Sequence, residues 1–252
     1  MTALQNETGK YLARPATAAI FGASGAIGQA VALSLAQGGR FSSVHTGSRK
    51  GRSVPAPNCV PFSFDLESEA SIVAAAATLP SSLDLIFVCT GMLHDQAAAI
   101  APEKTMRALD AKALARSYLI NAIGPALIAK HVLPRLAKDR RAIFAVLSAK
   151  VGSIGDNRLG GWHAYRASKA ALNMMIRNFA IEMGRTHPQA IAAALHPGTV
   201  RSALSAPFTA RISTGKIFTP EYAAERLLDV LDGLTPQDSG GLFAWNGVRL
   251  PD

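Results

Sequence analysis

A tyrosine and a lysine four positions apart, in the segment YRASKAALNM, are the residues of this sequence best suited to acid–base chemistry. On a helix Tyr165 and Lys169 share one face. An ammonium beside a phenol lowers the pKa of the phenol, which then exchanges a proton with a carbonyl or alcohol oxygen near neutral pH. Ser148, 17 positions earlier, ends a predicted strand and can hydrogen-bond the same oxygen.

A glycine-rich loop, FGASGAIG, lies between a predicted strand and a predicted helix near the N-terminus. Gly22 permits a tight turn, Gly25 and Ala26 let the main chain approach a phosphate, and Gly28 lets the helix pack against the sheet. The free N–H groups of the helix N-terminus favour a pyrophosphate. A tight turn without a ligand is the alternative explanation of this loop.

The end of the next strand indicates which dinucleotide is bound. NAD is usually held by a carboxylate on its ribose hydroxyls, but the sequence here is TGSRK, with no acidic residue. Arg49, assisted by Ser48 and Lys50, is suited to a 2′-phosphate, so we expect NADPH or NADP+ rather than NADH. Asp65, after the third strand, is expected to accept a hydrogen bond from adenine or to cap a helix.

These residues require a scaffold in which strands alternate with helices. Short apolar strands and intervening helices predict one α/β domain over residues 1–252, a doubly wound parallel sheet in three α/β/α layers, the Rossmann fold. Residues 1–14 are predicted to be a mobile extension, and 201–218 a substrate-loop region formed by a loop or two short helices. The predicted strands are 17–21, 44–46, 60–64, 84–89, 143–147, 191–195 and 241–243, and the predicted helices 26–37, 68–78, 111–136, 164–184 and 220–231. Gly124 and Pro125 either kink the helix predicted over 111–136 or mark its start.

Composition excludes several classes of protein. The net charge is +9, yet the 26 Lys and Arg residues form no long run, so we expect no nucleic-acid partner. The uncharged stretch 15–39 is interrupted by glycines, so neither a signal peptide nor a membrane span is predicted. Cys59 and Cys89 are expected to be buried small hydrophobes in a reducing, cytoplasmic protein. No metal site is predicted.

The chain resembles the short-chain dehydrogenase/reductase family over nearly its whole length, and within it the small carbonyl reductases. Gly22, Ala26 and Gly28 fit the family's glycine pattern, and YRASK fits its YxxxK motif. The resemblance implies that Tyr165 is the general acid/base, that Lys169 lowers its pKa and binds the nicotinamide ribose, and that Ser148 orients the substrate oxygen. It implies that Asn121, in LINAIGP, kinks a long helix and supports a water-linked proton path.

The same resemblance extends the set of expected nucleotide contacts. LHPGTV matches the family's PG motif, whose main chain meets the nicotinamide carboxamide. The expected cofactor-binding residues are Gly22, Ser24, Ala26, Ile27, Gly28, Ser48, Arg49, Asp65, Leu66, Gly91, Tyr165, Lys169, Pro197, Gly198, Thr199 and Val200. The resemblance also implies a homodimer or homotetramer.

Three departures from the family pattern are visible. Phe21 replaces the usual Thr, CTGM replaces NNAG around Gly91, and the Ser148–Tyr165 spacing is longer, which predicts a longer loop over 152–162. None removes a catalytic group. The predicted function is NADPH-dependent hydride transfer between nicotinamide and a carbonyl or alcohol. The alternatives are a dinucleotide-binding sensor or signalling protein, and a sugar-nucleotide epimerase-like enzyme, for which the chain after PGTV is short.

Some residues near the predicted cleft carry no assigned role. His94, His163 and His196 have no evident carboxylate partner in the sequence, and structural roles are the more common explanation for such histidines. Trp162 and Phe208 are expected to line a hydrophobic substrate pocket, to serve in packing or to form an oligomer contact.

Overall fold

A single twisted sheet forms the centre of the molecule. The computed structural model describes residues 16–210 and 213–252, so the extension predicted over 1–14 lies outside the described residues. The strand order is β3-β2-β1-β4-β5-β6-β7-β8, and every neighbouring pair is parallel except β7 and β8. The strands are β1 Ala16–Phe21, β2 Phe41–Ser48, β3 Cys59–Ser63, β4 Leu85–Val88, β5 Ala142–Leu147, β6 Ala190–His196, β7 Leu242–Ala244 and β8 Arg249–Leu250.

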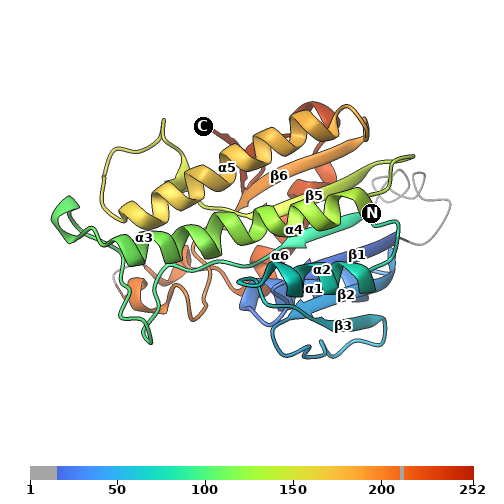
Figure 1. Cartoon of the computed structure of the whole chain (residues 1–252), viewed down its shortest axis with the longest axis horizontal. Helices are drawn as coiled ribbons and strands as arrows, with labels where there is room; N and C mark the ends of the chain where they lie inside the picture. Colours follow the sequence, from blue (N-terminus) through green and yellow to red (C-terminus); the bar gives the residue numbers. More distant parts are fainter. Residues whose placement is uncertain (1–15, 211–212) are drawn as a thin grey trace.

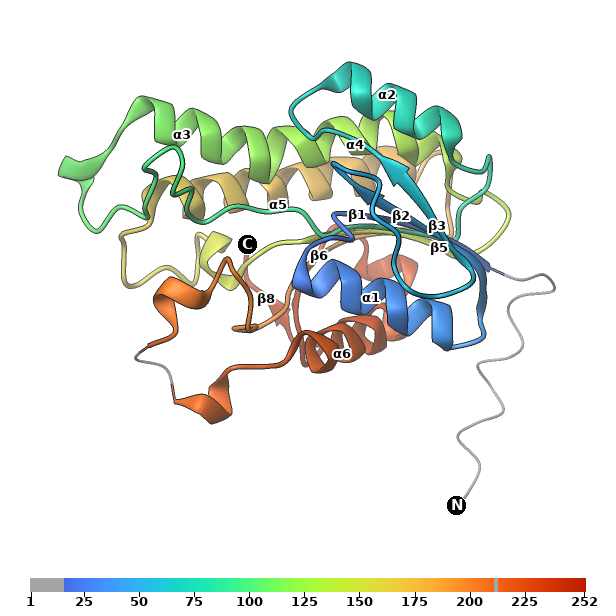
Figure 2. The ribbon, with the colours of Figure 1, turned by 90° about the horizontal axis from the view of Figure 1, so that it is seen from below.

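Helices cover both faces of this sheet, which confirms the predicted three-layer α/β/α architecture (Figures 1 and 2). Helices α1 and α6 pack together on one face, and α2, α4 and α5 lie on the other. The helices are α1 Ala26–Gln37, α2 Glu69–Thr78, α3 Ala111–Tyr118, α4 Gly124–Val132, α5 His163–Met183 and α6 Pro220–Gly233.

Two apolar cores hold the layers together, one on each face of the sheet. Side chains of a strand alternate between its faces, and β4 shows this directly. Ile86 and Val88 belong to the core under α4 and α5, whereas Leu85 and Phe87 belong to the core under α1 and α6. All four are buried, which explains why parallel strands of this kind appear in the sequence as continuous apolar runs.

The long helix predicted over 111–136 is divided into segments. Helix α3 leads into a π-helical turn, Leu119–Ile123, then α4, then a 3-10 turn at Leu133–Arg135. Gly124 and Pro125 begin α4 directly after the π-helical turn, and the preceding residue Ile123 is already helical, so the proline, which has no N–H to donate, lies where the hydrogen-bond pattern of a continuous helix changes. A Cβ on Gly124 would lie 2.5 Å from Cγ of Leu66, so this glycine lets the helix approach the end of β3 closely.

Several other boundaries differ from the predictions. Strand β2 begins at 41 rather than 44, because the polar residues Ser42, which is exposed, and Ser43, which is partly exposed, interrupt the apolar strand pattern. Strand β8 was not predicted; it pairs antiparallel with β7 over two residues. Cys59 and Cys89 are free cysteines at strand ends, and both pack partly buried against the core under α1 and α6, so the prediction of two buried cysteines is correct only in part.

The segment 201–218 contains two 3-10 helices, Ala206–Phe208 and Thr214–Lys216, which matches the predicted pair of short helices. A bridge between Val200 and Phe218 closes the base of the segment. Residues 211–212 lie outside the described residues. Within the described chain, no helix is both long enough and apolar enough to cross a membrane.

Candidate active site

Two adjoining cavities open at the carboxyl ends of the strands, where the order reverses between β1 and β4. In open α/β sheets this position is where ligands bind. The larger cavity has a volume of about 720 Å³ and the smaller about 340 Å³. They share Arg49, Cys89, Thr90 and Gly91 in their walls, among other residues, so together they form one elongated cleft.

The glycine loop forms the turn that the sequence predicted. Gly22 has φ +90°, and its main-chain N–H donates to the carbonyl of Gly47. A Cβ on Gly28 would lie 2.3 Å from the carbonyl oxygen of Gly22, so only glycine allows the first turn of α1 to sit there. No side chain caps α1, whose N-cap is Gly25. Its first N–H groups are therefore available to an anion.

The loop after β2 presents an arginine to both cavities. Ser48 is buried, and its hydroxyl oxygen accepts a hydrogen bond from the main-chain N–H of Arg52, which shapes this loop. Arg49 is exposed and makes no hydrogen bond or ion pair within the described part of the chain. The guanidinium can thus meet an anion without giving up a protein partner.

Asp65 and Leu66 form the wall of the smaller cavity below this loop. A carboxylate oxygen of Asp65 accepts from the main-chain N–H of Glu67. The cap of the following helix is Ser68, whose hydroxyl accepts from Ser71 N–H. The alternative role of Asp65 as the helix cap is therefore wrong, and its side chain remains on the cavity wall.

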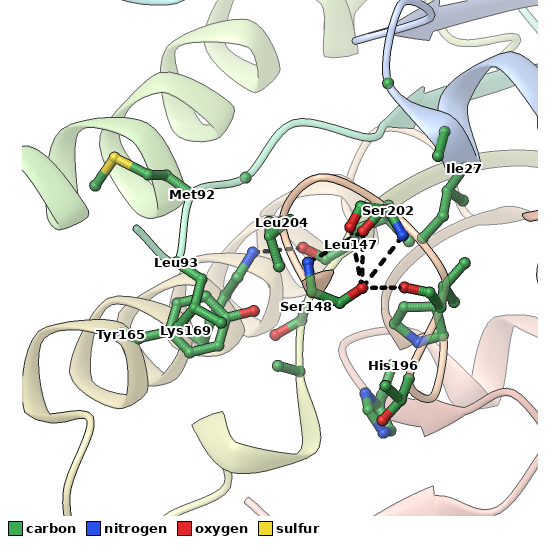
Figure 3. Close-up of a pocket in the computed structure, with 18 of the residues that line it drawn as sticks. Ile27, Met92, Leu93, Leu147, Ser148, Tyr165, Lys169, His196, Ser202 and Leu204 are labelled. Carbon is green, nitrogen blue, oxygen red and sulfur yellow. Dashed lines mark hydrogen bonds between the residues drawn. The ribbon is translucent and has the colours of Figure 1, made fainter. Parts of the chain in front are cut away.

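Tyr165 and Lys169 lie side by side on α5 in the larger cavity (Figure 3). The Lys169 ammonium is 5.9 Å from the centre of the Tyr165 ring and donates to the Leu147 carbonyl at 2.8 Å. Burial lowers the pKa of Lys169 to about 7 and raises that of Tyr165 to about 12. The predicted lowering of the tyrosine pKa is therefore wrong for this structure, because loss of solvation outweighs the neighbouring amine.

Ser148 lies at the end of β5 and lines the same cavity (Figure 3). Its hydroxyl donates to the side-chain Oδ1 of Asn173 at 2.6 Å. Asn173 follows Lys169 by one helical turn and was missed in the sequence, although the spacing 165, 169, 173 marks one face of α5. The structure thus brings Ser148, Tyr165 and Lys169 together, as predicted.

Asn121 is fully buried inside the π-helical turn and lines neither cavity. Its side chain accepts from the Met92 N–H and donates to the Met92 carbonyl, both at 2.8 Å. The same amide nitrogen lies 3.1 Å from the hydroxyl of Ser168, whose own proton goes to the Tyr165 carbonyl. Asn121 therefore fixes the segment after β4 against the helix that carries Tyr165.

A buried carboxylate holds the start of α5. Glu103 Oε2 accepts from the main-chain N–H of Ala164, and the Glu103 carbonyl accepts from Trp162 N–H. A carboxylate at this end of a 21-residue helix is stabilised by the helix dipole. No local sequence pattern indicates this contact, because the two segments are 61 positions apart.

The longer loop before α5 ends in an unusual conformation. Gly160, Gly161 and Trp162 all have positive φ, and Trp162 has a value of +51°. This turn places the Trp162 ring 6.3 Å from Tyr165 and 5.5 Å from Phe208, centre to centre. Both Trp162 and Phe208 line the cavity, so the wall beyond the tyrosine is aromatic. His94, 5.7 Å from Phe208, completes this wall.

The PG motif after β6 forms the opposite wall of the larger cavity. Gly198 has φ +76°, and a Cβ there would lie 2.6 Å from the Phe218 ring. His196 also lines the cavity, and burial lowers its pKa to about 4, so the imidazole is neutral at pH 7. His163 is the first residue of α5 and lines neither cavity.

Most of the predicted site residues line one or both of the cavities. The larger cavity is lined by Ala26, Ile27, Arg49, Gly91, Ser148, Tyr165, Lys169, Pro197, Gly198, Thr199 and Val200. The smaller is lined by Gly22, Ser24, Ser48, Arg49, Asp65, Leu66 and Gly91. Gly28 and Asn121 lie behind these walls. Thr90, which was not predicted, lines both cavities, and its buried hydroxyl oxygen has no hydrogen-bond partner among the described residues.

Fold and cleft together define a nucleotide-binding oxidoreductase, and comparison with known proteins identifies the family. A model of the family described as short chain dehydrogenase matches residues 16–212. The chain belongs to this family. It is 33% identical over 190 residues to the 1-hydroxy-2-glutathionyl-2-methyl-3-butene dehydrogenase of Rhodococcus sp. (74% of this chain, 77% of the relative). It is 32% identical over 168 residues to the C-signal protein of Myxococcus xanthus (65% and 95%).

Solved structures agree with this assignment. The NADPH-bound carbonyl reductase from chicken fatty liver superposes with a TM-score of 0.80 and is 26% identical, covering 96% of each chain. The carbonyl reductase Sniffer of Drosophila melanogaster has a TM-score of 0.79 at 19% identity, over 95% of this chain and all of that one, which shows the shared fold.

Proposed function

We propose that this chain is an NADPH-dependent carbonyl reductase that also oxidises the corresponding alcohols with NADP+. One observation carries the proposal. One end of the cleft has free helix N–H groups and Arg49, whose side chain has no partner among the described residues, and the other end has a tyrosine, a lysine and a serine. The family match supports the same conclusion, and so does the similar solved structure of a carbonyl reductase with bound NADPH.

The residues present fit a dinucleotide. Gly25 lines both cavities, and a Cβ there would contact only one protein atom within 4 Å, so this position leaves open space for a pyrophosphate. The hydroxyl of Thr90, which also lines both cavities, has no hydrogen-bond partner among the described residues. Arg49 binds the 2′-phosphate, which distinguishes NADPH from NADH. The nicotinamide supplies a hydride to the carbonyl carbon. Lys169 and Gly91, whose Cβ position lies 3.6 Å from the lysine ammonium, border the place of the nicotinamide ribose.

Tyr165 gives the proton that completes the reduction. Its raised pKa keeps the phenol protonated at neutral pH, and a protonated phenol is the form that donates to a carbonyl oxygen. Ser148 hydrogen-bonds the same oxygen. Asn121, which fixes the segment after β4 against α5, supports a water-linked path by which solvent returns a proton to the tyrosine. The aromatic wall of Trp162 and Phe208 favours substrates with an aromatic ring next to the carbonyl.

A fluorescence titration of NADPH and NADH tests the cofactor assignment. We expect Arg49→Ala to weaken NADPH binding by about 10- to 100-fold, the value of a charge-assisted hydrogen bond to phosphate, and to leave NADH unchanged. Arg52→Ala, in the same loop but outside both cavities, is the matched control. Equal binding of the two nucleotides by the unmodified protein would refute the role of Arg49.

Turnover is then measured with benzaldehyde, acetophenone and 1,4-naphthoquinone. Tyr165→Phe is expected to abolish reduction and to retain NADPH binding within about threefold. Full activity of this variant would contradict the proposed chemistry. NADPH binding without turnover of any carbonyl by the unmodified enzyme would favour the alternative of a dinucleotide-binding sensor.

We also propose that the chain forms a homo-oligomer through the exposed side of α5. Met174 and Ile181, seven positions apart and thus on one side of the helix, are 61% and 52% exposed. Light scattering after size exclusion distinguishes a dimer from a tetramer, and Ile181→Glu is expected to shift either towards monomer. A monomer in the unmodified protein would refute this assembly.

A further inference from the structure

The hydroxyl of Ser148 is already committed to a protein partner. A serine has one hydroxyl proton and two lone pairs. In the structure that proton goes to Oδ1 of Asn173, 2.6 Å away, and Ser148 is only 4% exposed. In this arrangement the serine offers the cleft only lone pairs, so it can accept a hydrogen bond but cannot donate one.

Asn173 occupies its place through the repeat of α5. Tyr165, Lys169 and Asn173 follow one another at four-residue intervals, so all three face the end of β5. Lys169 donates to the carbonyl of Leu147, and Asn173 binds the side chain of the next residue, Ser148. Two successive turns of the helix thus hold two successive residues of the strand in register.

The two forms of the substrate require opposite behaviour from the serine. A carbonyl oxygen only accepts hydrogen bonds, so Ser148 must donate to it, whereas an alcohol hydroxyl can donate to the serine oxygen. The Asn173 amide can serve both cases. Its Nδ2 has no partner within the described residues, and a half-turn of the amide places this N–H₂ against Ser148. The serine oxygen then accepts from the amide, and its proton is free to point into the cleft.

We propose that Asn173 is a positioning residue that sets the direction of the Ser148 hydroxyl proton, towards the substrate for a carbonyl and away from it for an alcohol. This inference rests on the proposed function. Asn173 lies outside both cavities, so it acts on the substrate only through Ser148.

Asn173→Asp separates this role from simple packing. A carboxylate of the same shape only accepts, so Ser148 must donate to it and loses its ability to donate to a carbonyl. We expect the carbonyl to bind the NADP+ complex about 10-fold more weakly, and the alcohol to bind the NADPH complex within about twofold of the unmodified enzyme. Since both directions share one transition state, kcat/KM falls by the same factor, about 10- to 100-fold, in both.

The experiment measures these two dissociation constants for the carbonyl that the unmodified enzyme reduces fastest and for its alcohol. Calorimetry measures the binding of the carbonyl to the NADP+ complex. The fluorescence of bound NADPH measures the binding of the alcohol to the NADPH complex. Asn178→Asp, the same change at an exposed position of α5, is the matched control. Asn173→Ala, which removes the partner without adding charge, is expected to weaken carbonyl binding by about threefold and to preserve folding.

A double-mutant cycle shows whether Asn173 acts through the serine. In Ser148→Ala protein, Asn173→Asp is expected to change carbonyl binding by less than twofold. An equal effect of Asn173→Asp with and without Ser148, or equal weakening of carbonyl and alcohol, would overturn the inference while leaving the proposed function intact. Absence of carbonyl turnover by the unmodified enzyme would instead refute the proposed function, and the inference with it.

Discussion

The buried amine of Lys169 makes the stability of the protein depend on pH in a specific window. Lys169 is 2% exposed, and burial lowers its pKa from 10.5 to about 7. Between these values the unfolded chain holds a proton that the folded chain has lost, so the free energy of unfolding rises with pH. From pH 7.0 to 8.5, a group with these two pKa values adds about 1.6 kcal/mol.

Lys169→Met removes this titration and keeps the apolar stem of the side chain. We expect the unmodified protein, without nucleotide, to become about 1 to 1.6 kcal/mol more stable between pH 7.0 and 8.5, and the variant to show no such rise. The other groups with shifted pKa values, such as His196 and the two cysteines, are present in both proteins. Their contributions therefore cancel when the variant is compared with the unmodified protein.

Urea unfolding at four pH values, at one protein concentration, measures the effect. Lys112→Met, an exposed lysine on α3, is the control and should follow the unmodified protein. Parallel curves for Lys169→Met and the unmodified protein would refute the reasoning, because they would show that Lys169 carries its ordinary charge in the folded state.

Two further predictions concern the turns that frame the cleft. In Gly28→Ala the new Cβ lies 2.3 Å from a main-chain oxygen, so we expect a loss of about 1 to 3 kcal/mol in urea unfolding, whereas Gly233→Ala, with open space around it, should cost nothing. Gly25→Ala meets only an ordinary contact at 3.4 Å; it should change stability by less than about 1 kcal/mol yet weaken NADPH at least 10-fold, and unchanged NADPH binding would contradict the phosphate assignment. Glu103→Ala removes the cap of α5 and should cost about 1 to 2 kcal/mol; the exposed Glu182→Ala is its control, and equal melting temperatures of the two variants would show that Glu103 does not hold the helix.

Local sequence patterns were sufficient to predict much of the fold and of the candidate site. The glycine turn before α1 and the pairing of Tyr165 with Lys169 each depend on a short segment whose geometry follows from helix and strand repeats. Strand β2 was predicted too short because polar serines interrupt its apolar pattern. The π-helical turn around Asn121 was not predicted in its detail, since it depends on main-chain contacts with a segment 29 positions away.

The sequence by itself therefore determined the class of fold, the place of the glycine turn and the residues at the centre of the proposed chemistry, because spacing along a helix or around a turn is a local property. Only the tertiary structure decided the pKa directions of Tyr165 and Lys169, the partner of Ser148 and the carboxylate that begins α5. These depend on burial and on contacts between distant segments, and both arise only when the layers pack.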